Sequence, residues 1–195
     1  MKNIYLIVAP SGAGKTTIAN ILEKQYGLKS IQSYTTRPMR FKGETGHTFV
    51  TDKEFDDLKN IVAYTKFAGF RYCATVQQVD ENDLYVIDPK GVEYFKTHYT
   101  GSKYIKVIFI NSGVSVRYER MVARAKADGV SHLEAVDSAL KRISNDAHEF
   151  YDYIHHNVPV DHIAYNDEGA DVNAAAKEIY EFIKREEKDN ESNKA

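Results

Sequence analysis

A chain of 195 residues with 43% hydrophobic content can bury one sizeable core but is too short for two ordinary domains, so we expect one domain with inserted lobes. The formal net charge of −2 argues against general nucleic-acid binding, so any anion site must be built from locally placed arginines. Because the single cysteine, Cys73, can form no internal disulfide and the apolar run Ile4–Val8 is too short to span a membrane, we expect a cytoplasmic protein without a membrane partner.

The apolar run Ile4–Val8 leads into a glycine-rich segment and then a helical pattern, which is the order that a triphosphate-binding loop requires. The glycines let successive backbone N–H groups turn inward around phosphate oxygens, Lys15 can reach the β- and γ-phosphates, and Thr16 can ligate Mg²⁺ through its hydroxyl. The motif begins with Ala9 instead of glycine, which is tolerated unless φ is positive there. The alternative is a glycine-rich turn that binds no ligand. The predicted ATP-binding residues are Pro10, Ser11, Gly12, Ala13, Gly14, Lys15, Thr16 and Thr17.

The next predicted elements are a helix, a strand and an inserted lobe. Residues 17–26 have apolar residues at helical spacing, and Gly27 ends this pattern in the position of a C-cap glycine. A short strand is expected at 28–33. Residues 34–81 are polar and interrupted by glycines, so we expect a loop-rich lobe with a short helix that begins after the capping box at Thr51.

The apolar run Leu84–Asp88 predicts a buried parallel strand that carries a carboxylate to the C-terminal edge of the sheet. We expect Asp88 to hold Mg²⁺ there through water; the alternative is an acid satisfied by backbone N–H groups. Alternating helix and strand patterns follow, which is typical of a parallel α/β sheet. These patterns are a helix from about Val92, a strand at Tyr104–Ile110 and a helix at Ser115–Ala127.

The C-terminal part is predicted to contain a lid and the end of the core. The helical pattern breaks before Ser131, where a second capping box restarts a long helix that reaches about Tyr153. A last core strand is expected at His162–Tyr165 and an amphipathic helix at Ala174–Ile183. Because residues 184–195 are almost wholly charged or polar, we expect a disordered tail there.

The inserted lobe opens with the segment Ser33–Arg40, where a serine-x-threonine-threonine-arginine motif is followed three residues later by a second arginine, and Gly43-Glu44 comes next. In these motifs the chain resembles the guanylate kinase family, over about Asn3 to Ile183 and including Asn166-Asp167. The resemblance implies a P-loop NTPase three-layer α/β fold with a central parallel sheet, an inserted acceptor-binding lobe and a helical lid. Within one domain at 1–183, it assigns the core to 1–33, 82–119 and 143–183, the lobe to 34–81 and the lid to about 120–142.

The same resemblance implies an ATP- and Mg²⁺-dependent nucleoside monophosphate kinase. The residues implied to bind the acceptor are Ser33, Arg37, Arg40, His47 and Tyr72, with His47 in the place of a family tyrosine. A guanidinium suits this task, because its planar fork makes bidentate, charge-assisted bonds to phosphate.

Three further arginines match the lid arginines of the family, which act in cis on the transferring γ-phosphoryl group. Two of them, Arg120 and Arg124, share one helix face by spacing with Arg117, which lies outside the match, and Arg142 follows on the next helix. With the lysine of the loop and one acceptor arginine, they complete the expected catalytic set, which is Lys15, Arg37, Arg120, Arg124 and Arg142.

The acceptor stays open, because most guanine contacts of the family are replaced here. Ala63 stands where the family has a glutamate, Ala74 where it has a serine, and Pro89-Lys90 where it has a second acid. A carboxylate that accepts from guanine would contribute several kcal/mol of discrimination, at about 1.5–3 kcal/mol per bond. GMP or dGMP is the leading acceptor. The alternatives are a non-guanine or modified nucleotide or a sugar phosphate, and a non-catalytic binding module; we expect a monomer or homodimer.

Overall fold

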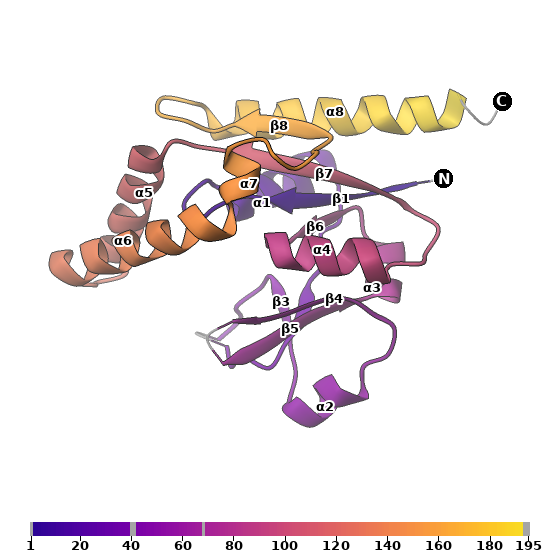
Figure 1. The fold of residues 1–195 in the computed structure, drawn as a ribbon, viewed down its shortest axis with the longest axis horizontal. Coiled ribbons are helices and arrows are strands. Elements are labelled where there is room, and N and C mark those ends of the chain that lie inside the picture. Colours follow the sequence, from indigo (N-terminus) through magenta and orange to yellow (C-terminus); the bar gives the residue numbers. More distant parts are fainter. Residues whose placement is uncertain (1, 40–41, 68, 193–195) are drawn as a thin grey trace.

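The computed structural model describes residues 2–39, 42–67 and 69–192, and within them the chain folds around two β-sheets (Figure 1). The core sheet has the strand order β6-β1-β7-β8, and all neighbouring strands in it are parallel. Its strands are β1 (Asn3–Val8), β6 (Leu84–Val86), β7 (Tyr104–Asn111) and β8 (His162–Tyr165). This sheet confirms the predicted parallel α/β core, in which helices make the crossovers between parallel strands.

Helices cover both faces of the core sheet, which gives the three layers that the sequence predicts. Because side chains alternate along β1, Tyr5 and Ile7 face one layer while Leu6 and Val8 face the other. The first layer contains α1 (Lys15–Tyr26) and α8 (Val172–Ser192), and the second contains α4 (Pro89–His98).

The lobe between α1 and β6 has a sheet of its own, where the sequence predicted mainly loops. Its order is β3-β2-β5-β4, with β2 and β3 parallel and the other pairs antiparallel. The strands are β2 (Ser33–Thr35), β3 (His47–Phe49), β4 (Ile61–Phe67) and β5 (Phe70–Thr75). The short helices α2 (Asp52–Asp57) and α3 (Val76–Glu81) each begin at a capping box. The strand expected at 28–33 is shifted to β2, and only a single bridge joins Ser30 to Leu84.

The predicted lid consists of two packed helices that project beyond the core sheet (Figure 1). They are α5 (Val114–Ala127) and α6 (His132–Glu149). The long helix expected to reach Tyr153 ends earlier, and a separate short helix, α7 (Tyr151–Ile154), follows Phe150. The Ser131 hydroxyl caps α6 by accepting the N–H of Glu134, as the sequence predicts.

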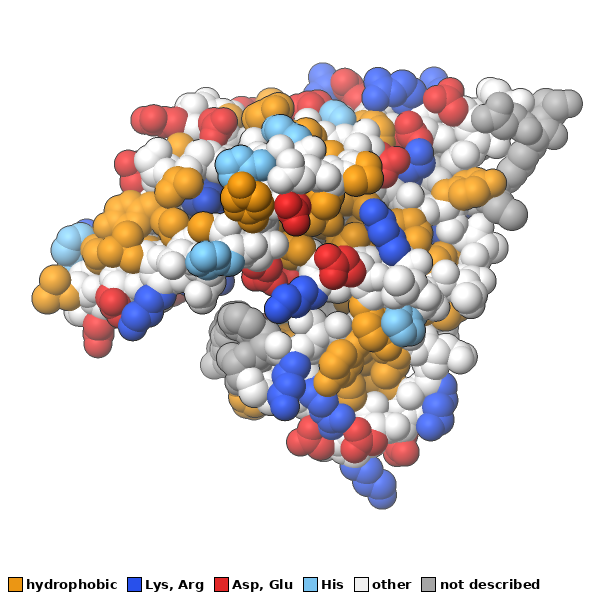
Figure 2. Space-filling view, in the orientation of Figure 1, with side chains coloured by type: hydrophobic (Ala, Val, Ile, Leu, Met, Phe, Trp, Pro, Cys, Tyr) orange, Lys and Arg blue, Asp and Glu red, His pale blue; other side chains and the backbone are white. Residues whose placement is uncertain are grey.

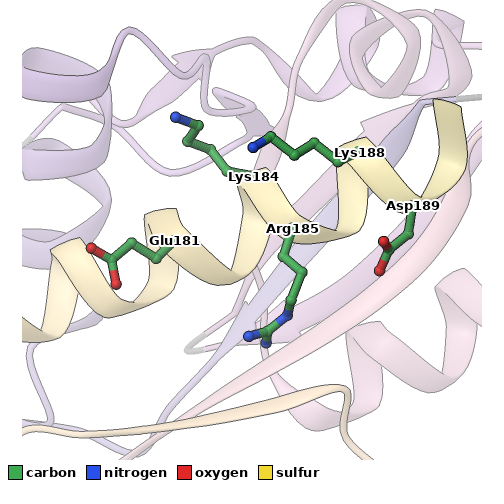
Figure 3. Close-up of a pocket in the computed structure, with 5 residues that line it drawn as sticks. All are labelled: Glu181, Lys184, Arg185, Lys188 and Asp189. Carbon is green, nitrogen blue, oxygen red and sulfur yellow. The ribbon is translucent and has the colours of Figure 1, made fainter. Parts of the chain in front are cut away.

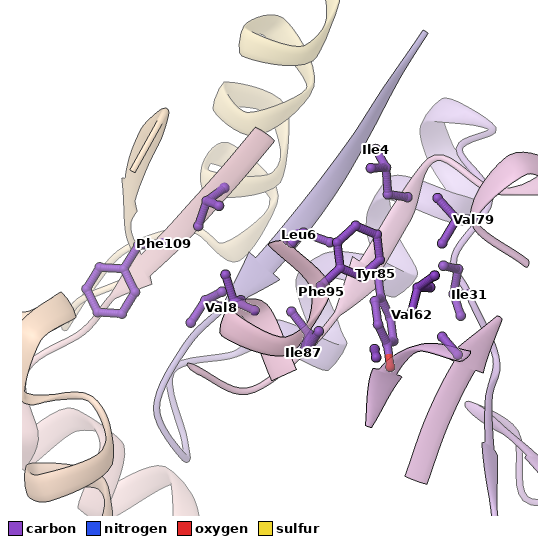
Figure 4. Close-up of a cluster of buried hydrophobic side chains, with 14 of the residues drawn as sticks. Ile4, Leu6, Val8, Ile31, Val62, Val79, Tyr85, Ile87, Phe95 and Phe109 are labelled. Atoms are coloured by element: carbon purple, nitrogen blue, oxygen red, sulfur yellow. The ribbon is translucent and has the colours of Figure 1, made fainter. Parts of the chain in front are cut away.

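One hydrophobic cluster joins the core sheet to the lobe. It contains Leu6 and Phe109 from the core sheet together with Val62 and Ala74 from the lobe. Figure 4 shows that its side chains extend from β7 across β1 and β6 to the lobe strands. The two sheets therefore share one apolar interior, and the lobe is not a separate body.

The C-terminal segment is helical, so the expected disordered tail is wrong for residues 184–192; residues 193–195 lie outside the described part. Two acidic side chains of this segment have long-range partners. Glu186 lies 2.7 Å from Lys106 Nζ, and Glu187 accepts from the Tyr5 hydroxyl at 3.3 Å. These contacts order a stretch whose composition alone suggests disorder. Of the helices in the described residues, α8 included, not one combines the length and apolar character needed to cross a membrane.

Candidate active site

The glycine-rich segment between β1 and α1 forms the loop that the sequence predicts. Gly12 and Gly14 both have left-handed backbone, with φ of 79° and 96°. A Cβ on Gly12 would lie 2.6 Å from the backbone oxygen of Arg117, and one on Gly14 would lie 2.5 Å from Asn166 Nδ2. Both positions therefore need glycine for conformation and for space. Ala9, which replaces the first glycine of the motif, is fully buried and does not have positive φ.

Lys15, the first residue of α1, lies within a group of charges. Its ammonium donates to the Ala9 carbonyl at 3.2 Å. Burial lowers the pKa of Lys15, the charge of Asp146 opposes this shift, and the charges of Arg142 and Arg124 lower the pKa further. Two lid arginines are thus close enough to act on Lys15. Such an electrostatic interaction is expected of cations that would bind the oxygens of one triphosphate.

Asn166, which follows β8, supports the loop from another side. Its buried side chain donates to the Ala13 carbonyl at 2.9 Å. Its own backbone carbonyl accepts from Ser112 Oγ and from Arg120 Nη1, each at 2.9 Å. Arg120, a predicted lid arginine, is therefore held at the loop by the segment that follows β8.

Arg117 has a different environment from the lid arginines that follow it. It is 2% exposed, and its Nη1 lies 3.0 Å from Asp146 Oδ2. The Asp146 carboxylate also accepts from the N–H of Ser11 at 2.7 Å and from its hydroxyl at 3.2 Å. The spacing placed Arg117 on one face with Arg120 and Arg124, but its charge is paired inside the protein.

Arg37 lies in the acceptor lobe and forms a buried, bidentate pair with Glu44. The Nη2–Oε1 distance is 2.7 Å and the Nη1–Oε2 distance is 3.1 Å. The Nε atom of Arg37 is buried, and no hydrogen-bond partner for it exists among the described residues. Because this N–H is buried, a phosphate can accept from it only after the side chains that cover it move.

The other acceptor residues predicted from the sequence lie around Arg37. Ser33 Oγ and His47 Nδ1 are 2.9 Å apart, with donor and acceptor set by the histidine tautomer. The rings of His47 and Tyr72 have centroids 5.5 Å apart. Arg40, the second predicted acceptor arginine, lies outside the described residues. On the face shown in Figure 2, a hollow separates the lid from the lobe, and charged side chains gather at its edge.

The chain matches the profile of the family described as guanylate kinase over residues 1–168. This chain belongs to the guanylate kinase family. It is 30% identical over 166 residues to a guanylate kinase of Rhodopseudomonas palustris, which covers 77% of this chain and 73% of the relative. It is 27% identical over 154 residues to a guanylate kinase of Polaromonas sp., with 74% and 73% covered. The crystal structure of guanylate kinase from Anaplasma phagocytophilum superposes with a TM-score of 0.60 at 21% identity, covering 95% and 86% of the two chains.

Family membership confirms two predictions. The enzyme class of guanylate kinases is ATP-dependent nucleoside monophosphate kinase, a phosphotransferase with a phosphate group as acceptor. The fold is the P-loop α/β fold, since the structural likeness extends over nearly the whole chain. The roles of individual residues are not tested by these matches and stay predictions.

Asp88, the predicted magnesium ligand, lies two residues beyond β6 and caps α4. Its Oδ1 accepts from the N–H of Gly91 at 2.7 Å. One carboxylate oxygen therefore binds a backbone N–H, as the alternative to a magnesium ligand predicts. Glu149 lies nearby: burial raises its pKa, and the charge of Asp88 raises it further.

Thr16 is exposed in the first turn of α1. Hydroxyl and carboxylate oxygens are the hard ligands that Mg²⁺ prefers, so Thr16 and Asp88 fit the ion. In the described parts of the chain, acidic, histidine and cysteine side chains form no group of three that could hold a metal.

Two of the positions where the family has guanine contacts are apolar and internal in this chain. Ala63 on β4 and Ala74 on β5 lie directly opposite each other. They are 1% and 0% exposed and belong to the same cluster as Tyr85. A glutamate at position 63 would bury its carboxylate among these side chains, which is costly without a partner.

Two residues of the site carry no role in the sequence prediction. Glu44 appears there as part of the lobe motif, yet it fixes the guanidinium of Arg37. Asp146 is absent from the sequence prediction. Its position four residues after Arg142 was the available signal, since that spacing places both on one helix face.

A recess on α8 is unrelated to this site. It is lined by side chains of that one helix, shown in Figure 3, and does not include any predicted site residue. Its lining residues are Glu181, Lys184, Arg185, Lys188 and Asp189.

Proposed function

We propose that this enzyme transfers the γ-phosphoryl group of ATP to a nucleoside monophosphate, with GMP or dGMP as the leading acceptor. The observation that carries the proposal is the glycine-rich loop between β1 and α1, in which Gly12 and Gly14 have left-handed backbone and Lys15 begins the helix. A second cation with an unpaired buried donor, Arg37, stands in the lobe. Two phosphate-binding regions in one site are what transfer between two phosphate groups requires. Family membership supports the same reaction.

In the proposed reaction, the phosphates of ATP lie on residues 9–17. Backbone N–H groups at the start of α1 bind them, and Lys15 neutralises the β- and γ-phosphates. Thr16 would hold Mg²⁺ directly and Asp88 through water, and the bound ion would offset charge on the phosphates. The lid residues proposed to stabilise the loose transition state are Arg120, Arg124 and Arg142.

The acceptor phosphate is proposed to bind in the lobe. Arg37 would donate through Nε after the side chains that cover this atom move, while its two Nη atoms stay with Glu44 and keep the guanidinium plane in one orientation. His47 and Tyr72 supply further donors, and Arg40 is the proposed second arginine. A phosphate dianion is already a competent nucleophile, so the reaction needs no general base. Catalysis then consists of positioning and charge stabilisation.

A second candidate acceptor is a nucleoside monophosphate with another or modified base, or a sugar phosphate. The buried pair of Ala63 and Ala74 favours this candidate, because it removes the carboxylate and the hydroxyl with which the family reads guanine. Ser33 is the remaining base contact, and its hydroxyl is close to His47.

The test is a coupled ADP-release assay with ATP·Mg²⁺ and a panel of acceptors. The panel contains all ribo- and deoxyribonucleoside monophosphates and ribose 1,5-bisphosphate. A preference for GMP or dGMP supports the first candidate, and a preference for another member supports the second. Absence of ADP release above the ATP-only rate for every acceptor would contradict the proposed kinase.

We also propose a cytoplasmic location and a monomer or homodimer. The location is supported by Cys73: burial raises the pKa of its thiol to about 12, so the thiol is unreactive and has no disulfide partner in the chain. Sedimentation of the purified protein distinguishes the two assembly states.

A further inference from the structure

The ion pair between Arg117 and Asp146 is buried and lies beside the phosphate loop. Arg117 on α5 is 2% exposed and Asp146 on α6 is 5% exposed. Their Nη1 and Oδ2 atoms are 3.0 Å apart. A buried pair of this kind adds little net stability, because the loss of hydration offsets the attraction between the charges. The pair is therefore more important for the positions of the residues that it contacts than for the stability of the protein.

The pair fixes the backbone of Ser11 in the loop. Asp146 accepts the N–H of Ser11 at 2.7 Å, and Arg117 Nη1 donates to the Ser11 carbonyl at 3.4 Å. Arg117 Nε also donates to the carbonyl of Ser112, just beyond β7, at 3.2 Å. The pair thus connects the loop, the end of a core strand and α6. Ser11 cannot shift without breaking contacts to both members.

Asp146 also fixes the orientation of α6. Arg142 lies four residues before it and Glu149 three residues after it, so the three share one helix face. Asp146, in the middle of this face, accepts from the N–H of Ser11 at 2.7 Å and from its hydroxyl at 3.2 Å. The face of α6 that carries Arg142 is therefore turned toward the loop, and Asp146 is the point at which that face is anchored.

We propose that Arg117 and Asp146 form a positioning pair for the transfer reaction: they anchor α6 to the loop at Ser11 and thereby hold Arg142 beside Lys15. Neither member is assigned a contact with the reacting phosphates. They act through Ser11 and Arg142. The proposal rests on the proposed kinase function, which supplies the reaction that Arg142 serves.

The decisive variant replaces both charges at once, as Arg117→Leu with Asp146→Ala. Each single variant leaves one buried charge unpaired, so its Tm should fall by roughly 6–20 °C. The double variant leaves none and keeps the net charge beside the loop, so its Tm should stay near that of the wild type. Its kcat at saturating substrates should nevertheless fall about ten- to hundredfold, because a displaced Arg142 no longer stabilises the charge of the transition state. Its acceptor KM should change less than about threefold.

The control removes the ion pair between β7 and α8, as Lys106→Met with Glu186→Leu, and leaves Asp161, 3.3 Å from Lys106, without that lysine. The side chains of the removed pair lie 2.7 Å apart and belong to neither phosphate region. This double variant should keep the wild-type kcat. A wild-type kcat in the stable Arg117→Leu, Asp146→Ala protein would overturn the proposal, since the pair would then be structural only.

A double-mutant cycle tests whether the pair acts through Arg142. In an Arg142→Leu background, adding the Arg117→Leu, Asp146→Ala change should lower kcat by less than about threefold. An undiminished loss in that background would overturn the proposal. If the double variant does not fold by circular dichroism, Asp146→Asn, which keeps the side-chain shape, takes its place in the same cycle.

Failure of the proposed function gives a different result from failure of the positioning pair. If the wild type turns over no acceptor of the panel, the kinase proposal fails, and calorimetric titration with ATP·Mg²⁺ still tests the anchor. The double variant should then bind ATP about three- to tenfold more weakly than the wild type, because the Ser11 part of its loop is no longer held in place. Equal binding would overturn the positioning role.

Discussion

Replacing Lys15 by Met should lower kcat by about 10²–10³-fold and yet stabilise the protein without nucleotide. Loss of a preorganised donor at the transferring phosphate costs about 10²–10³ in kcat, or about 2.7–4 kcal/mol. The stability should change in the other direction. Burial lowers the pKa of Lys15, and the single hydrogen bond described for its ammonium, to the Ala9 carbonyl at 3.2 Å, is a long one. An apolar side chain of similar length avoids the cost of burying that charge, so the free energy of unfolding should rise by about 1 kcal/mol.

Proton linkage adds a pH dependence with a defined sign. The pKa of Lys15 is lowered in the folded protein, so between that pKa and its ordinary value of about 10.4 the unfolded chain binds more protons than the folded chain. The Lys15 contribution to wild-type stability therefore rises with pH in this window, whereas the Met variant has no such titration. The stability advantage of the variant should be complete below this window and shrink toward its upper end.

Urea denaturation at neutral pH and at roughly pH 10 measures the stability difference, and ADP release measures kcat. The control is Lys24→Met, at an exposed position in the last turn of the same helix. It should keep full activity and lose at most about 0.3–1 kcal/mol from its interaction with the helix dipole. A Lys15→Met protein clearly less stable than the wild type would refute the reasoning on the buried charge. Retained turnover would refute the assignment of the ATP site.

Three further changes test other contacts of the site and fold. Asn166→Ala leaves the buried Ala13 carbonyl without its donor and should lower the free energy of unfolding by about 1–3 kcal/mol in urea denaturation. A loss no larger than that of a substitution at an exposed position would contradict the support of the loop by Asn166. Glu44→Gln weakens two charge-assisted hydrogen bonds to Arg37, which are worth about 1.5–3 kcal/mol each. In steady-state assays it should raise the KM of the acceptor more than the KM of ATP. An equal rise in both KM values would contradict an acceptor role of Arg37. Removing residues 184–195 deletes the partner of Lys106 on α8 and should lower the unfolding free energy by about 1–2 kcal/mol; calorimetry that gives an unchanged Tm would contradict an ordered end of this helix.

The sequence predicts the loop and the core sheet well, because each step of them has a local signal. A short apolar run, two glycines, a lysine and a helical pattern follow one another directly from Ile4 to Tyr26, and the structure contains β1, the loop and α1 in that order. The core strands around Leu84, Tyr104 and His162 are likewise found near their predicted positions.

The parts that the sequence does not predict depend on contacts between distant residues. A charge on a helix looks the same in sequence whether it is solvated or paired, so nothing near Arg117 indicates its partner on α6. The lobe sheet is missed for a related reason. Its strands β2 and β3 are three residues long, too short to show alternation, and they are ordered by pairing with neighbours. The end of α8 is helical because Glu186 and Glu187 reach partners on β7 and β1, which composition cannot reveal.

The hydrophobic cluster shared by the core sheet and the lobe has a consequence for how the enzyme can change. Ala63 and Ala74 lie in the same interior as Leu6 and Phe109, so the lobe and the core should unfold in one cooperative transition. A larger side chain at either alanine must also fit that interior. Overpacking it costs about 1–3 kcal/mol, a sizeable share of the stability of a domain. A change of acceptor preference through either alanine should therefore occur together with compensating substitutions in the core. Selection for a new acceptor at these positions would then also act on the stability of the fold.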